Sequence, residues 1–258
     1  MAETAIPFGS GSPRPVVTGK LGWRNTHFRQ ETNVTRDLST SALRCYQIHL
    51  GGDRNFHYLL GDPGGGDAVA VDPGFDAAGF AAVAQQCGLN ITSILITHGH
   101  PDHDGAAEAL AQLTGAAILR GDVREGRQGL THGQVVRAGS LAIEALATPG
   151  HAPDHFCFRA PGVLVTGDLL FCGKVGGTGS YFPGSSARQE WESLQLVLQL
   201  PDDLRVLPGH DYYGGEGEMP YSTIGQERTN NPFLAGDFEA FCNLKDNWAT
   251  YKQEHGIR

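Results

Sequence analysis

The sequence lacks the features that would direct the chain to a membrane or to a nucleic acid. Its 258 residues contain no apolar run near the roughly 20 residues that span a bilayer, and its first residues hold no apolar segment of the signal-peptide kind. Positive charge is scarce, because 19 Lys and Arg face 28 Asp and Glu, and no basic cluster stands out. We therefore expect a cytoplasmic globular protein without nucleic-acid or membrane partners; the sequence leaves open whether it forms a homo-oligomer.

Paired cysteines are also lacking. The five cysteines are an odd number, lie far apart and include no CxxC pair, which excludes a disulfide framework and a thiolate zinc site. Glycine, by contrast, is abundant, with 36 residues. This excess predicts many turns and close backbone approaches, as an active site built from loops requires.

The pattern along the chain predicts two mixed sheets with helices on their outer faces. Residues 1–40 are polar, show no sustained strand or helix period and are expected to form an N-terminal extension; residues 41–235 are expected to form the main domain and 236–258 a helical C-terminal tail. Strands are predicted over residues 43–52, 55–62, 67–74, 91–98, 116–121 and 205–209, with hairpins over 135–150 and 155–168. Helices are predicted over residues 76–88, 104–115, 186–200, with Ser185 or Ser186 as cap, and 238–256.

The stretch ILITHGHPDHDG concentrates metal-ligating side chains directly after a buried strand. His98 and His100, separated by one residue, can bind the same ion, while Asp102 and His103 on the next bend can face a neighbouring ion. Imidazole and carboxylate suit zinc, iron or manganese. Asp104 is expected to cap the following helix rather than to bind metal.

Three further candidates follow strands in the same way. His151 ends ATPGH, Asp168 ends VLVTGD and His210 ends RVLPGH. Each motif is weak alone, since a histidine or aspartate after a turn is usually an ordinary polar residue. Combined with the first cluster, they give five histidines and two aspartates at strand ends, which is enough for two ions.

In this order and spacing, THGHPDH, PGH, GD and PGH resemble the metallo-beta-lactamase superfamily, in particular its glyoxalase II-like branch of hydroxyacylglutathione hydrolases and persulfide dioxygenases. The resemblance covers about residues 43–235 and implies an alpha-beta-beta-alpha sandwich with a metal site at one edge. It implies that His98, His100 and His151 hold the first ion, that Asp102, His103 and His210 hold the second, and that Asp168 bridges them. It implies that His155 is a structural neighbour of the site. It also implies that Asp72 either supports the metal loop, the loop that carries His98 to His103, or is a plain turn residue.

The resemblance also implies a reaction and a substrate. Two divalent ions, zinc before iron or manganese, would bridge a hydroxide that attacks a thioester such as an acylglutathione, with Asp102 and Asp168 as catalytic residues. Lys174 in CGKVGG and Tyr212 in GHDYY match glutathione contacts of this branch, although Gly176 stands where the branch has an aromatic residue. The loop from Tyr212 to Tyr221 either lines the pocket or is an uninvolved surface loop.

A competing interpretation uses the same residues for another reaction. His98, His151 and Asp168 can form a facial triad for one Fe(II), which would make the protein a persulfide dioxygenase acting on glutathione persulfide. Lactone hydrolysis by a dimetal site is a third interpretation. The choice between hydrolase and oxygenase depends on whether Asp102, His103 and His210 hold a second ion.

Overall fold

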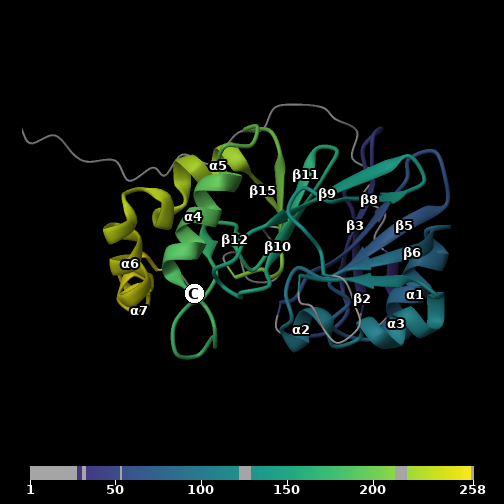
Figure 1. The fold of residues 1–258 in the computed structure, drawn as a ribbon, viewed down its shortest axis with the longest axis horizontal. Coiled ribbons are helices and arrows are strands. Elements are labelled where there is room, and N and C mark those ends of the chain that lie inside the picture. The colour runs from purple at the N-terminus through teal and green to yellow at the C-terminus, as the bar shows by residue number, and fades with distance from the viewer. Residues whose placement is uncertain (1–27, 31–32, 53, 122–128, 213–219, 257–258) are drawn as a thin grey trace, which may run out of the picture.

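Two sheets face each other and helices cover both outer surfaces (Figure 1). The computed structural model describes residues 28–30, 33–52, 54–121, 129–212 and 220–256. Helices α1 and α3 cover the first sheet, and α4 to α6 cover the second. This is the alpha-beta-beta-alpha sandwich expected from the sequence.

The first sheet holds the N-terminal half of the described chain in the order β1-β2-β3-β4-β5-β6-β7. Its strands pair antiparallel from β1 to β5, whereas β5, β6 and β7 run parallel. The strands are β1 (Phe28–Gln30), β2 (Asn33–Asp37), β3 (Arg44–His49), β4 (His57–Gly61), β5 (Asp67–Val71), β6 (Asn90–Leu95) and β7 (Ala117–Leu119).

The second sheet has the order β15-β14-β11-β10-β9-β8, and a two-stranded ribbon of β12 and β13 follows β11 in the chain. All its pairs are antiparallel except β11 with β14. The strands are β8 (Val135–Ala138), β9 (Leu141–Ala147), β10 (Phe156–Ala160), β11 (Val163–Gly167), β12 (Leu170–Phe171), β13 (Lys174–Val175), β14 (Arg205–Pro208) and β15 (Ser222–Thr223).

Helix starts follow the capping residues of the sequence. Asp76 accepts a hydrogen bond from the amide of Gly79 at the start of α1, and Ser186 accepts one from Gln189 at the start of α4. No helix in the described part of the chain is long and apolar enough to cross a membrane. The helices are α1 (Ala77–Gln86), α2 (Pro101–Asp104), α3 (Ala107–Thr114), α4 (Ala187–Val197), α5 (Ile224–Asn230), the 3-10 helix η1 (Pro232–Leu234), α6 (Phe238–Asp246) and α7 (Trp248–His255).

The apolar residues divide into three layers that hold the sandwich together. One cluster fills the space between the two sheets and includes Tyr58 and Phe158, a second packs α1 and α3 on the first sheet, and a third packs α4 to α6 on the second. Burial of these layers is the main favourable contribution to folding. All five cysteines are free, as expected.

The sequence predictions at the two ends of the described chain are wrong. The strands β1 and β2 pair antiparallel at the edge of the first sheet, where a segment without strands was expected. This edge is polar, so main-chain pairing to β3 orders it rather than an apolar alternation. The helix predicted over 238–256 breaks at Asn247, whose side-chain amide donates to the carbonyl of Asn243 and competes with the helical main chain.

Strand direction brings the ends of β6, β9, β11 and β14 to one edge of the sandwich. β9, β11 and β14 run in the same direction within the second sheet, because β10 lies antiparallel to both β9 and β11. The segments that follow these strands carry His98, His151, Asp168 and His210. Side chains that are far apart in the chain are thereby collected at one point.

A buried ion pair fastens α6 to the rest of the fold. Lys245 donates to Glu190 of α4 and, over 2.7 Å, to the carbonyl of Gly176. The carboxylate of Glu190 is fully buried, and its Oε1 has no hydrogen-bond partner among the described residues. Lys245 is therefore the counter-ion of a charge that the interior could not otherwise hold.

We expect Lys245→Met to destabilise the fold by about 3–5 kcal/mol in urea unfolding, because the variant leaves a buried carboxylate unpaired. Burial already raises the pKa of Glu190 to about 7. Protonation of Glu190 at low pH removes the unpaired charge from the variant. The loss in free energy of unfolding should therefore be smaller at about pH 5 than at about pH 8. Lys252→Met, at a partly exposed lysine of α7, is the control. A loss that is equal at both pH values would contradict this account.

Candidate metal centre

The loop after β6 turns tightly into α2 and brings four polar side chains to the sheet edge. Pro101 opens the short helix α2 directly after His100, and the helix predicted over residues 104–115 begins only at Ala107, as α3. Gly74 allows the close approach of this loop, because a Cβ there would overlap the main-chain oxygen of Asp102. The predicted capping role of Asp104 is wrong: the residue ends α2, and its carboxylate accepts a hydrogen bond from Arg120 at 2.9 Å.

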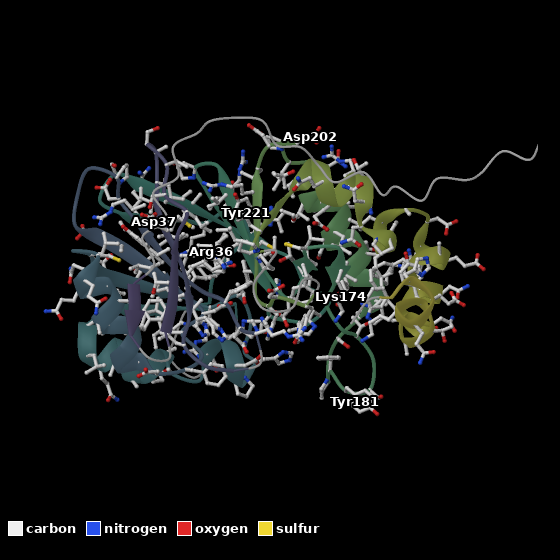
Figure 2. All side chains as sticks on the ribbon, turned by 180° about the vertical axis from the view of Figure 1, so that it is seen from behind. Arg36, Asp37, Lys174, Tyr181, Asp202 and Tyr221 are labelled. Carbon is white, nitrogen blue, oxygen red and sulfur yellow. The ribbon has the colours of Figure 1, made fainter. Side chains whose placement is uncertain are left out.

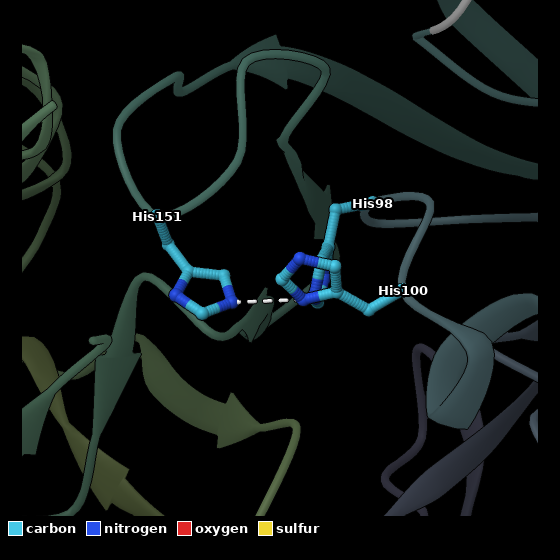
Figure 3. A group of neighbouring side chains, drawn as sticks. All are labelled: His98, His100 and His151. Atoms are coloured by element: carbon cyan, nitrogen blue, oxygen red, sulfur yellow. Dashed lines mark hydrogen bonds between the residues drawn. The ribbon is translucent and has the colours of Figure 1, made fainter. Parts of the chain in front are cut away.

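Three histidines, which we name the first triad, converge on one point. They are His98, His100 and His151 (Figure 3). The Nδ1 atom of His100 lies 2.9 Å from Nε2 of His98 and 3.1 Å from Nε2 of His151. The other nitrogen of His151, Nδ1, donates to the carbonyl of Gly177 at 2.8 Å and so leaves the Nε2 lone pair directed at the centre.

A second triad, consisting of Asp102, His103 and His210, lies beside the first. The Nε2 atoms of His103 and His210 are 3.3 Å apart, and Oδ2 of Asp102 lies 3.3 Å from Nε2 of His210. Both imidazoles are buried, whereas the carboxylate of Asp102 is 38% exposed. Donor atoms from two separate segments of the chain therefore meet within 4.8 Å of one another.

Asp168 lies between the two triads. Its Oδ1 is 3.3 Å from Nε2 of His103, and its Oδ2 is 3.5 Å from Nε2 of His210 and 3.6 Å from Nε2 of His151. Oδ1 is buried and has no hydrogen-bond partner among the described residues. Gly209 leaves space for this carboxylate, because a Cβ there would overlap Asp168 Oδ1.

The electrostatics of the centre favour a cation. Burial holds the pKa of His98 well below its ordinary value and also lowers that of His151. Burial opposes the charged form of His210 too, but the carboxylates of Asp168 and Asp102 outweigh it and raise its pKa to about 9. Burial likewise opposes ionisation of Asp168, yet the charges of His103 and His210 keep its pKa well below the usual range. The donor set fits divalent metal ions, which supply this positive charge without protons.

Asp72 supports the metal loop from behind. Its carboxylate accepts from the amide and hydroxyl of Thr97, at 2.7 and 2.6 Å, and faces Nδ1 of His103 at 2.9 Å. Its φ of 52° is rare for a residue with a side chain, so the surrounding contacts hold it there. Of the two roles considered from the sequence, the contacts match the support of the loop.

His155 takes part in hydrogen bonds around the centre, in the way expected of a structural neighbour. Its Nδ1 lies 2.9 Å from the hydroxyl of Thr148, and its Nε2 accepts from the amide of Asp168 at 3.3 Å. With Nε2 occupied by that amide, His155 fixes the main chain at Asp168.

A cavity of about 560 Å³ opens beside Asp168 and His151. Lys174 and Tyr212, the two predicted substrate contacts, both line it, with the Lys174 ammonium 4.3 Å from the centre of the Tyr212 ring. Burial lowers the pKa of Lys174, and so does the charge of Lys252. The close approach of the main chain requires glycine at position 176, because a Cβ there would overlap the main-chain oxygen of Asp168. Of the loop from Tyr212 to Tyr221, residues 213–219 lie outside the described residues.

Phe182 is a wall of the site that the sequence did not indicate. Its ring centre lies 4.9 Å from that of His151 and 6.1 Å from that of His100. The neighbouring Tyr181 points away from the body of the protein and is 91% exposed (Figure 2). The segment around them has no helix or strand period, so nothing local distinguished the inward ring from the outward one.

Comparison with known proteins agrees with this architecture. The model of the Metallo-beta-lactamase superfamily matches residues 50–210. A hydroxyacylglutathione hydrolase of Bradyrhizobium sp. (strain BTAi1 / ATCC BAA-1182) is 36% identical over 247 residues, covering 78% of this chain and 91% of that protein. A beta-lactamase hydrolase-like protein of Agrobacterium fabrum is 32% identical over 224 residues, or 73% of this chain; the match covers 52% of that relative, so the chain spans about half its length.

Solved structures show the same fold. ETHE1 from Myxococcus xanthus has a TM-score of 0.69 at 31% identity, covering 83% of this chain and 90% of that one. TTHA1623, solved in a di-iron-bound form, has a TM-score of 0.61 at 29% identity, covering 73% and 99%. The family profile, the hydrolase relatives and the His/Asp clusters agree with the fold and the metal chemistry expected from the motifs. The chain therefore belongs to the metallo-beta-lactamase superfamily.

Proposed function

We propose that the protein is a thioester hydrolase of the glyoxalase II type that works with two divalent metal ions, zinc before iron or manganese. The observation that carries the proposal is the complete second triad: Asp102, His103 and His210 lie together beside the first triad, with Asp168 between the two. A reaction that needs only one metal ion does not account for three further donor residues beside the first triad. The hydroxyacylglutathione hydrolase relatives support the same proposal.

When held by the two triads, divalent ions would lower the pKa of a bound water and polarise a substrate carbonyl. The residues of the chain divide the remaining tasks. Asp168 lies between the triads, with its Oδ2 near both His151 and His210 and its Oδ1 near His103. The partly exposed Asp102 can accept a hydrogen bond from the attacking water and orient it. Phe182 covers the first triad and restricts the access of bulk water. A thiolate, with a usual pKa of about 8.5, leaves without help from an acid.

The cavity supports an anionic thioester as substrate. Lys174 has no carboxylate within ion-pair distance among the described residues, although it is largely buried against Tyr212 and Phe171. A desolvated ammonium without a counter-ion favours a ligand that brings a negative charge. The carboxylates of a glutathione moiety would supply that charge, and the aromatic residues Phe233 and Trp248 would pack against its apolar parts.

One observation favours a second function. The likeness to ETHE1 of Myxococcus xanthus fits a dioxygenase that holds one Fe(II) through His98, His151 and Asp168 and acts on glutathione persulfide. The two functions use the same first-triad region and differ in their need for the second triad. A variant confined to the second triad therefore separates them.

We expect His210→Ala to reduce hydrolysis of S-lactoylglutathione by about 100-fold or more, because it removes one of three donors from the second triad. Hydrolysis is followed by the loss of thioester absorbance, and oxygen uptake with glutathione persulfide is measured on the same samples. His255→Ala, at an exposed histidine of α7, is the matched control. Oxygen uptake by the wild type that His210→Ala leaves intact, with no thioester hydrolysis, would overturn the proposal in favour of the oxygenase.

We expect Lys174→Met to raise KM for S-lactoylglutathione about tenfold or more with little change in kcat, since the lysine binds a part of the substrate far from the reacting carbonyl. A thioester of an uncharged thiol should show no such change in KM. Equal losses with both thioesters would show that Lys174 does not recognise the charge of the substrate.

A further inference from the structure

Asn55 lies against the second triad although it belongs to a distant part of the sequence. It precedes β4 and forms an isolated bridge with His210. The amide of Phe56 donates to the carbonyl of Gly209 at 2.8 Å, and the amide of Asp211 donates to the carbonyl of Arg54 at 2.9 Å. The main chain around Asn55 is thus fixed to the segment that carries His210.

The side chain of Asn55 is directed at Asp102. Its Nδ2 donates to the carboxylate oxygen Oδ2 at 3.1 Å and to the main-chain oxygen of the same residue at 3.3 Å, and lies 3.5 Å from Nε2 of His210. The side chain has no freedom to turn, because Asn55 is only 2% exposed and its Oδ1 packs against Gly52, where a Cβ would overlap it. The orientation of the amide is therefore set before any ion arrives.

Asp102 is the donor of the second triad that most needs such a tether. Its carboxylate is 38% exposed, whereas His103 and His210 are 1% and 3% exposed. A partly exposed carboxylate has other rotamers open to it in water, and holding it in one costs side-chain entropy. A neutral N–H donor restrains the carboxylate without adding a positive charge that would repel a cation.

We propose that Asn55 is the positioning residue of the second metal site: it holds the Asp102 carboxylate towards His103 and His210 and so determines whether the chain binds one ion or two. The assignment rests on the proposed dimetal function. It adds to that function a residue outside the metal-binding motifs, and it places the control of the second ion in the segment before β4.

Metal titration of the metal-free protein tests the assignment. Zinc is added in the presence of a competing chelator, and the ions retained per chain are counted by elemental analysis. We expect Asn55→Ala to lower the affinity for the second zinc ion by about 10–100-fold, as for other residues that orient a ligand. The affinity for the first zinc ion should stay unchanged. The first ion also reports whether the variant is folded. Asn55→Ser, with a hydroxyl too short to reach Asp102, should behave in the same way and replaces the alanine variant if that variant does not fold.

Asn231→Ala is the matched control. Asn231 is also 2% exposed, and it also donates to a carboxylate, Oε2 of Glu227 at 2.8 Å, and to a carbonyl, that of Lys174 at 3.2 Å. Its replacement should leave both zinc affinities unchanged. If the wild type and the Asn55 variants bind two ions with equal affinities, or if the variants weaken both ions equally, the assignment is wrong and the proposed function stands. A wild type that binds a single ion would overturn both.

Discussion

The buried carboxylate of Asp168 is the constraint on which the rest of the site depends. An ionised carboxylate away from water is stable only beside positive charge, and here imidazoles of both triads surround it. Gly209 provides the space for it, and His155 accepts a hydrogen bond from its main-chain amide. A centre organised around a shared negative charge is suited to divalent cations, and the donors around it form two adjacent triads.

The two sheets supply different parts of this centre. The loop after β6 of the first sheet brings Asp102 and the neighbouring histidines, whereas the second sheet brings His151, Asp168 and His210 from the ends of β9, β11 and β14. Their distances therefore depend on the packing of the apolar layer between the sheets, which includes Tyr58 and Phe158. The hydroxyl of Tyr58 donates to the carbonyl of Pro208, two residues before His210, and couples that layer directly to the site.

Local patterns predicted those features whose cause is local. Most strands of the two sheets, and the helices α1 and α4 with their caps Asp76 and Ser186, followed from apolar periods and turn residues. The metal-binding motifs followed from donors placed directly after strands. The strand pair β1–β2 escaped prediction because its polar residues are ordered by pairing to β3. Asn55 and Phe182 escaped because tertiary packing creates their contacts: Asn55 is 47 residues from Asp102 in the chain, and Phe182 meets His151 through a loop without a period.

The proposed function requires that both triads hold a metal ion and share Asp168. Anomalous diffraction from crystals of the natively purified protein, recorded on both sides of the zinc and iron absorption edges, tests it most directly. We expect two anomalous peaks per chain, one among His98, His100 and His151 and the other among Asp102, His103 and His210, with Asp168 contacting both. A single peak at full occupancy, with the second triad empty, would contradict it.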